Sequence, residues 1–240
     1  MKAAPDAQAA LLTLVDLDAK AKAADTRKRT LPEHEQLNQL NTRRRALADE
    51  VTKATTRASD AETAMARIEA DLETARTRLQ RDQKRIDDGV VNDARSIASL
   101  QDEIAHLTGR VSELEDQQLE QMMSIEDDRK AAEKATAQKA EIETQMRALI
   151  ASRDQATAAA DAEIAELMAQ RAAVVSSLPS ELVALFDKAS RAGSGAAQFK
   201  AGRCAGCGLM LDALARRAAE ESPADDVIRC PECGRILVRG

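Results

Sequence analysis

The chain has 240 residues, of which 32% are charged, and its only aromatic residues are two Phe. A globular core of this length normally uses more aromatic volume, so the composition argues against an ordinary globular domain and is typical of long helices or coiled coils. The net charge of −6 argues against a general attraction to nucleic acid or to an anionic membrane surface.

The first segment predicts a helix over about 6–29, with an apolar stretch that contains Leu11, Leu12, Leu14, Val15 and Leu17. Acidic residues interrupt its apolar stretch, so it does not resemble a secretion signal, and no apolar run reaches the roughly 20 residues that span a bilayer. We therefore expect a cytoplasmic protein. Pro32 lacks an amide hydrogen and disfavours helical geometry at Leu31, so a new helix is expected to begin there.

Two long segments repeat apolar residues at alternating spacings of three and four, which is typical of a coiled-coil seam. The first seam begins at Leu37 and predicts a helix over 33–87; the second begins at Ile97 and predicts a helix over 93–178. Only a few residues join them. Two long helices with so short a connection must fold back on each other, which predicts an antiparallel hairpin.

The connection contains Gly89, which can adopt a positive φ, and Asn92 or Asp93, either of which can cap the following helix. A turn centred there predicts that paired residues have numbers adding to about 179, with Leu72 opposite Leu107 and wholly apolar layers on both sides. Extended to the first helix, the same pairing would bring two acidic residues, Asp16 and Glu163, together. No register is therefore predicted for that stretch.

Pro179 ends the second long helix, and a short helix is predicted over 180–190. The Gly, Ser and Ala residues that follow predict a hinge at 190–198. The chain thus divides into a helical domain over 1–190 and a cysteine-containing domain over 197–240.

All four cysteines fall in that last domain, as two C-x-x-C-G pairs: Cys204, Cys207, Cys230 and Cys233. Two residues between ligands let a tight turn direct both sulfurs at one metal, and a glycine after each pair eases the sharp turn. Four thiolates complete a tetrahedral zinc site and leave no position for a reactive water. The pattern therefore predicts one structural Zn²⁺, on which folding of this small domain should depend. Disulfides, buried free thiols, a redox C-x-x-C and an iron–sulfur centre are the alternatives.

Other residues offer no basis for catalysis. His34 and His106, the only histidines, fall off the seam and are expected to be surface residues. Without a partnered nucleophile, a phosphate-binding loop or an open metal site, we expect no catalytic residues, no cofactor-binding residues and no enzyme. Basic side chains near the cysteines favour nucleic-acid binding as a second hypothesis, although the stacking residues Tyr and Trp are absent. Four of these basic residues flank the cysteine pairs: Arg203, Arg229, Arg235 and Arg239.

The chain resembles the bacterial C4-type zinc-ribbon coiled-coil proteins. The resemblance is carried by "VNDARSIASLQDEIAHLTGRVSELEDQQLEQM" after the turn and by "GRCAGCGLML" and "RCPECGRILV" around the cysteines. It implies a long antiparallel helical hairpin with a C-terminal zinc ribbon whose metal ligands are the four cysteines. It also implies an adaptor or regulatory role, tied in some relatives to flagellar or secretion systems and to sigma-factor or RNA binding.

The predicted fold is therefore mainly α, a long antiparallel coiled-coil hairpin with a small C-terminal zinc ribbon built on four cysteines. The predicted function is that of a non-enzymatic adaptor or scaffold that binds protein partners through both parts. The alternatives are a nucleic-acid-binding regulator acting through the ribbon and a redox or iron–sulfur protein. The sequence assigns neither the partner nor the oligomeric state.

Overall fold

The computed structural model describes residues 1–191 and 193–239. It divides into two compact units, one formed by 35–149 and the other by both ends of the chain, 1–34 and 150–239. The helices are α1 (Pro5–Arg29), α2 (Pro32–Asp87), α3 (Ala94–Ser176), α4 (Ser180–Ser190) and α5 (Ala213–Glu221); the strands are β1 (Ala196–Lys200), β2 (Arg203–Cys204), β3 (Ile228–Arg229) and β4 (Ile236–Arg239). A search of the described helices finds none with the length and apolar character of a membrane span. The predicted mainly helical fold with a long hairpin is confirmed.

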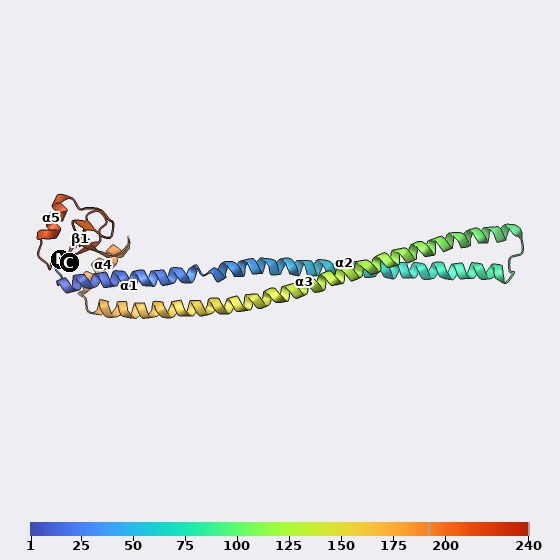
Figure 1. The fold of residues 1–240 in the computed structure, drawn as a ribbon, viewed down its shortest axis with the longest axis horizontal. Helices are drawn as coiled ribbons and strands as arrows, with labels where there is room; N and C mark the ends of the chain where they lie inside the picture. Colours follow the sequence, from blue (N-terminus) through green and yellow to red (C-terminus); the bar gives the residue numbers. More distant parts are fainter. Residues whose placement is uncertain (192, 240) are drawn as a thin grey trace. The chain divides into compact units, whose positions relative to one another are not determined.

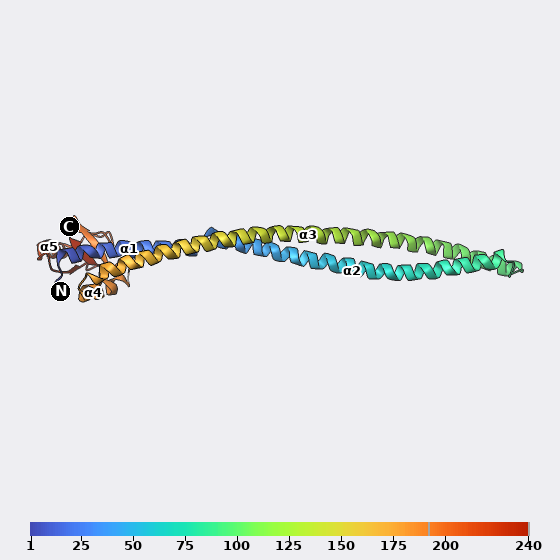
Figure 2. The same cartoon turned by 90° about the horizontal axis from the view of Figure 1, so that it is seen from below.

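In the unit formed by 35–149, α2 and α3 run side by side and cross each other, as both views show (Figures 1 and 2). Gly89 turns the chain with a φ of 65°, and its N–H donates to the carbonyl of Ile86 at 3.0 Å. The carboxylate of Asp93 accepts the N–H of Ser96 at 2.8 Å and so satisfies an amide in the first turn of α3. The turn therefore uses the glycine and one of the two capping residues that the sequence indicates.

Ion pairs between the two helices show the register of this hairpin. Ion pairs bridge α2 and α3 between residues whose numbers add to between 185 and 191: Arg57–Asp128, Glu62–Arg129 and Arg76–Glu115. The apolar cluster at one part of the seam contains Leu72 and Leu114, not Leu72 and Leu107. The predicted sum of about 179 is therefore wrong by about one heptad, although the seam residues themselves are the predicted ones.

One seam position carries a buried charge. The Asp82 carboxylate accepts hydrogen bonds from Nε and Nη2 of Arg81, at 3.0 and 3.2 Å. These hydrogen bonds and the nearby Arg85 hold the pKa of Asp82 below its ordinary value. The aspartate therefore remains ionised within a mainly apolar stripe.

In the other unit, α1 lies against the C-terminal part of α3. Arg27 pairs with Glu163, whereas Asp16 pairs with Lys20 of its own helix at 2.6 Å. The clash between Asp16 and Glu163 that the 179 register would have produced is therefore absent. Arg171 of α3 donates to Asp18 of α1 at 2.6 Å and to Asp187 of α4 at 3.2 Å, which ties three helices together.

A four-stranded sheet, in the order β2-β1-β4-β3, completes this unit. Strands β1 and β4 are parallel, and the two outer pairings are antiparallel. Successive side chains of a strand point to opposite faces, so each central strand contributes to two apolar clusters. The helix-facing cluster joins the sheet to α1 and α4, and its buried members are Ala3, Leu11, Leu14, Leu182, Phe186, Ala196, Ile236 and Val238.

The N-terminus is also bound to the cysteine-containing part of the chain. The N–H of Ala3 donates to the carbonyl of Asp225 at 2.8 Å, and the N–H of Val227 donates to that of Met1 at 3.1 Å. The buried amide of Gln8 donates to the carbonyls of Ala3 and Ala224. The first residues of the chain therefore hold the loop before β3 in place.

These contacts correct the prediction of a hinge at 190–198. Residues 196–198 belong to β1, and Ala196 and Ala197 are buried because the sheet packs on both faces. Ala192 of the predicted hinge lies outside the described residues. Within its unit, the sheet is joined to the helices through a shared apolar cluster.

Candidate metal centre

The four cysteines lie on two loops of the same construction. In each, a C-x-x-C pair is followed by a glycine with positive φ, 76° at Gly208 and 71° at Gly234. Each of these glycines donates its N–H to the carbonyl of the first cysteine of its pair, at 2.8 Å to Cys204 and 2.9 Å to Cys230. The residue before each pair is an arginine that reaches back to the glycine carbonyl. This contact is 3.4 Å from Arg203 Nη1 to Gly208 and 3.0 Å from Arg229 Nε to Gly234.

The two loops face each other and bring the four sulfurs together. Every Sγ atom lies within 4.8 Å of the others. Cys204 Sγ is 3.8 Å from Cys233 Sγ, and Cys207 Sγ is 3.9 Å from Cys230 Sγ. A tetrahedral site with Zn–S bonds of about 2.3 Å has sulfurs about 3.8 Å apart. The arrangement thus fits a four-coordinate metal, and the separations are far longer than the roughly 2.05 Å of a disulfide bond.

The site is closed by apolar side chains on the second face of the sheet. Cys204 and Cys230 are buried, and Cys207 and Cys233 are half-buried. Leu237 of β4 packs on the cysteine side, opposite to its neighbours Ile236 and Val238. The cysteine-facing cluster contains Ala197, Cys204, Leu211, Cys230 and Leu237 as its buried members.

Arg235 borders the cysteines and links them to the segment before β1. Its Nε donates to Ser194 Oγ at 2.8 Å, and its side chain also donates to Cys233. The first cysteine loop leaves room for this side chain only because it contains Gly206. A Cβ at that position would overlap Arg235 and come within 2.9 Å of the Cβ of Ala197.

The environment affects the four thiols unequally. Burial raises the pKa of Cys204 and raises that of Cys230 to about 12. Burial also acts to raise the pKa of Cys233, but hydrogen bonds from the backbone and side chain of Arg235 outweigh it and lower the pKa to about 6. A metal bound here would therefore meet one thiolate already stabilised by a cation and two thiols that must lose a proton.

Several sequence-based expectations for this region need correction. Leu209 and Met210, apolar residues that follow the first cysteine pair, are about half exposed, and helix α5 was not predicted. Leu214 on α5 is 81% exposed. A signal for α5 does exist in the sequence, because Asp212 caps it by accepting the N–H of Ala215 at 2.7 Å.

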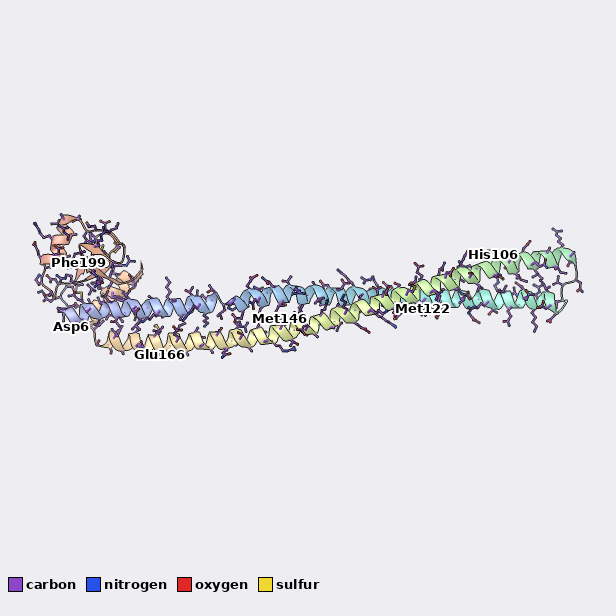
Figure 3. The ribbon with its side chains drawn as sticks, in the orientation of Figure 1. Asp6, His106, Met122, Met146, Glu166 and Phe199 are labelled. Carbon is purple, nitrogen blue, oxygen red and sulfur yellow. The ribbon has the colours of Figure 1, made fainter. Side chains whose placement is uncertain are left out.

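The two histidines lie far along the chain from the cysteines. Both are exposed, His34 on α2 and His106 on α3, where Figure 3 labels it. Among the described residues, the four cysteines are the group of potential metal ligands that lie close enough together to hold one metal ion.

Comparison with known proteins agrees with this architecture. The model of the CT398-like coiled coil hairpin domain matches residues 14–194, and that of the C4-type zinc ribbon domain matches residues 203–237. An uncharacterized protein of Mycobacterium tuberculosis is 30% identical over 245 residues, which cover 100% of this chain and 98% of that protein.

Solved structures show the same fold. A structure from Mycobacterium smegmatis is similar over the full length of both chains, with 29% identity and a TM-score of 0.85. CT398 from Chlamydia trachomatis is similar over 98% of each chain, with 15% identity and a TM-score of 0.74, and supports the fold alone. The chain therefore belongs to the family of proteins with a CT398-like coiled coil hairpin, and its cysteines lie in a C4-type zinc ribbon.

Proposed function

We propose that this protein is a non-enzymatic adaptor whose zinc ribbon binds a protein partner. The observation that carries the proposal is a set of three exposed apolar side chains close together in the sequence of the ribbon, Leu209, Met210 and Leu214, here called the ribbon patch. Exposed apolar side chains that are grouped together are typical of interaction sites. In this proposal the helices of 1–190 and the ribbon of 197–240 act as two binding domains.

We further propose that Cys204, Cys207, Cys230 and Cys233 hold one structural Zn²⁺. The distances between their sulfurs support this assignment, as does the match to a C4-type ribbon. With four sulfur ligands the metal fixes the shape of the ribbon and leaves no open coordination position. Free thiolates that bind zinc are maintained in a reducing compartment, so we place the protein in the cytoplasm.

The basic residues next to the ribbon patch indicate the chemistry of the partner. Arg203 pairs in a short β-bridge with Met210, and the side chain of Arg216 lies beside Gly202. Guanidinium groups at the edge of an apolar surface favour carboxylates on the opposing surface. The partner expected for the ribbon patch is a protein segment that carries apolar side chains flanked by acidic ones.

The arginines of the ribbon support nucleic-acid binding less than they support binding of a protein partner. Arg239 donates to backbone carbonyls around the loop before β3, including those of Ser222 and Asp226 at 2.7 and 2.8 Å. Arg229 and Arg235 likewise donate to groups of the ribbon or of the segment next to it. Donors used in this way stabilise the fold, whereas phosphate binding needs donors directed at solvent.

The test is affinity capture with crosslinking from the native cell, using the intact chain, before and after nuclease treatment. Leu214→Lys should lose the protein partner, because the substitution places a charge in the ribbon patch. Val90→Lys is the matched control, since Val90 is also strongly exposed but lies in the turn between α2 and α3. The adaptor proposal fails if every specific partner disappears with nuclease and the purified protein binds RNA or DNA tightly at physiological salt.

A further inference from the structure

The ribbon sheet has an open edge beside β2. Arg203 of β2 and Met210 form an antiparallel bridge. Backbone hydrogen bonds join the residues on either side of this pair: the N–H of Leu211 to the carbonyl of Gly202 at 2.9 Å, and the N–H of Cys204 to the carbonyl of Leu209 at 3.1 Å. In this type of antiparallel pair, the two facing residues exchange no hydrogen bonds with each other. The N–H and the carbonyl of Met210 therefore point away from β2.

These outward groups are available to another chain. Among residues 1–191 and 193–239, neither the N–H nor the carbonyl of Met210 has a backbone hydrogen-bond partner. Asp212 is also extended, with φ −60° and ψ 166°. Alternate residues of a strand direct their backbone groups to the same side, so the N–H of Asp212 points the same way as that of Met210. The segment 210–212 thus presents two donors and one acceptor along its outer edge.

The side chains of this edge do not protect it from pairing. Edge strands are commonly protected by Lys, by Pro, by a bulge or by a covering element. Here the three residues 209–211 are apolar, and Leu209 and Met210 are 51% and 55% exposed. Leu211 is buried in the cysteine-facing cluster and anchors the segment to the ribbon. The edge is therefore apolar, exposed and held in place.

We propose that the segment 210–212 binds an extended segment of a protein partner, which adds a strand to the ribbon sheet. The added backbone accepts hydrogen bonds from the N–H groups of Met210 and Asp212 and donates one to the carbonyl of Met210. Every second side chain of the added strand lies on the face that carries the Met210 side chain, which favours apolar residues at those positions. The proposal rests on the adaptor function, because it states how the ribbon holds its partner.

A second copy of the same edge fits less well. A symmetric antiparallel pairing about Met210 would place Asp212 of one copy opposite Gly208 of the other. Gly208 has a φ of 76°, so the chain is not extended there. Two copies would therefore exchange only the hydrogen bonds of Met210, whereas a separate extended segment also bonds to Asp212.

A displayed library of random peptides, selected on the zinc-loaded full chain, is the probe. The selected peptides should carry apolar residues at every second position. Met210→Pro removes the outward N–H but no hydrogen bond to β2, because Leu209 and Leu211 make those bonds. Met210→Ala is the matched control, since it also shortens the side chain but keeps the N–H. The selected peptides should bind Met210→Ala at least about tenfold more tightly than Met210→Pro.

Two further measurements accompany this comparison. Zinc content and slow hydrogen exchange of the Cys204 and Leu211 N–H groups verify that Met210→Pro is folded. N-methylation of the peptides tests the contact on the wild-type chain and does not depend on the folding of any variant. It should abolish binding at alternate residues and be tolerated at the residues between them, because only alternate backbone groups of a strand face its neighbour.

The proposal is overturned by peptides that bind Met210→Pro and Met210→Ala equally, by N-methylation without an alternating effect, or by a library that yields no binding peptide. Self-association of the wild type that Met210→Pro abolishes would assign the edge to a second copy and also overturns it. Capture from the native cell separates this proposal from the adaptor function. A protein partner that Leu214→Lys loses and Met210→Pro retains would support the adaptor function and contradict strand addition.

Discussion

At the scale of single residues, Arg235 connects the metal centre to the rest of its unit. It stabilises the Cys233 thiolate, bonds to Ser194, and occupies space that any residue larger than Gly206 would take. The C-x-x-C-G pattern predicts the ligands but not this role. An arginine after a cysteine loop has many conformations open to it, and only the fold brings Ser194 and Gly206 to its side.

Zinc binding should release protons near neutral pH. The raised pKa values of Cys204 and Cys230 mean that both thiols are protonated in the metal-free protein, and zinc binds thiolates. Affinity for zinc should therefore rise with pH between about pH 6 and 8, as protons compete less strongly. Calorimetry in buffers of different ionisation enthalpy should detect a proton from each of these cysteines. Binding without proton release would contradict the assignment of the two thiols.

Gly206→Ala should weaken zinc binding, because the new methyl group would collide with Ala197 and the Arg235 side chain. Competition with a chromophoric chelator measures the zinc affinity of each variant. Ala205→Ser is the control, since Ala205 is the exposed neighbour in the same loop. Equal affinities for Gly206→Ala and the wild type would show that Arg235 can move aside.

At the scale of elements, the sequence predicted the helices and the seam but not their register. A slip of one heptad leaves every seam residue in phase, so the repeat alone cannot distinguish Leu107 from Leu114 as the partner of Leu72. The turn restricts the register only loosely, because the six residues between α2 and α3 can adopt several conformations that connect the helices in different registers. The charged pairs between the helices then distinguish the alternatives, and they become visible only in three dimensions.

Paired cysteines should report the register directly. In the zinc-loaded chain, oxidation should join Leu72→Cys to Leu114→Cys, because these positions share an apolar cluster. The pair Leu72→Cys and Leu107→Cys should remain reduced, since a shift of seven residues moves its members about 10 Å apart along the helix axis. Peptide mapping identifies the products. Preferential bridging of Leu72→Cys to Leu107→Cys would restore the predicted register.

Two glycines of the hairpin should respond in opposite ways to the same substitution. At both Gly89 and Gly109, a methyl group in place of the α-hydrogen would have no neighbouring atom within 4 Å, so space is not limiting at either residue. Gly109 lies inside α3, and Gly109→Ala should stabilise the hairpin by about 1 kcal/mol through helix propensity. Gly89 has a φ of 65°, so Gly89→Ala should destabilise it by roughly 1 kcal/mol. Urea unfolding followed by circular dichroism measures both, and changes of the same sign would contradict this account of the turn.

At the scale of the whole molecule, the two ends of the chain build one compact unit. The sequence predicted a hinge before the ribbon because Gly and Ser are frequent there. It contained no indication that Ile236 and Val238 would meet Leu11, Leu14 and Phe186. Contacts between residues so far apart in the chain leave no periodic pattern in a single sequence. The side chains of β4 alternate between the two faces of the sheet over only four residues, and this pattern does not specify which element covers each face.

A substitution that disrupts packing on one face of the sheet should therefore leave the packing on the other face intact. Phe186 is fully buried in the helix-facing cluster, whereas the cysteines belong to the cluster on the other face. Phe186→Ala should destabilise this unit by about 3–5 kcal/mol, the usual range for truncating a buried Phe, and should release the ribbon from α1 and α4. Zinc should stay bound, because no cysteine contact is removed. Cys230→Ser should instead lose the metal and disorder the cysteine loops while the hairpin of α2 and α3 persists.

Hydrogen exchange and metal analysis on the same samples separate these outcomes. In Phe186→Ala, the N–H groups of Ala3 and Val227, which bond between the N-terminus and the loop before β3, should lose protection while one zinc per chain remains. Leu214→Ala is the control, because truncating a strongly exposed side chain should change stability by less than about 0.5 kcal/mol. If Phe186→Ala loses zinc together with the protection of Ala3, the two clusters form one cooperative unit. The metal would then stabilise the packing of the ribbon on α1 and α4 as well as the ribbon itself.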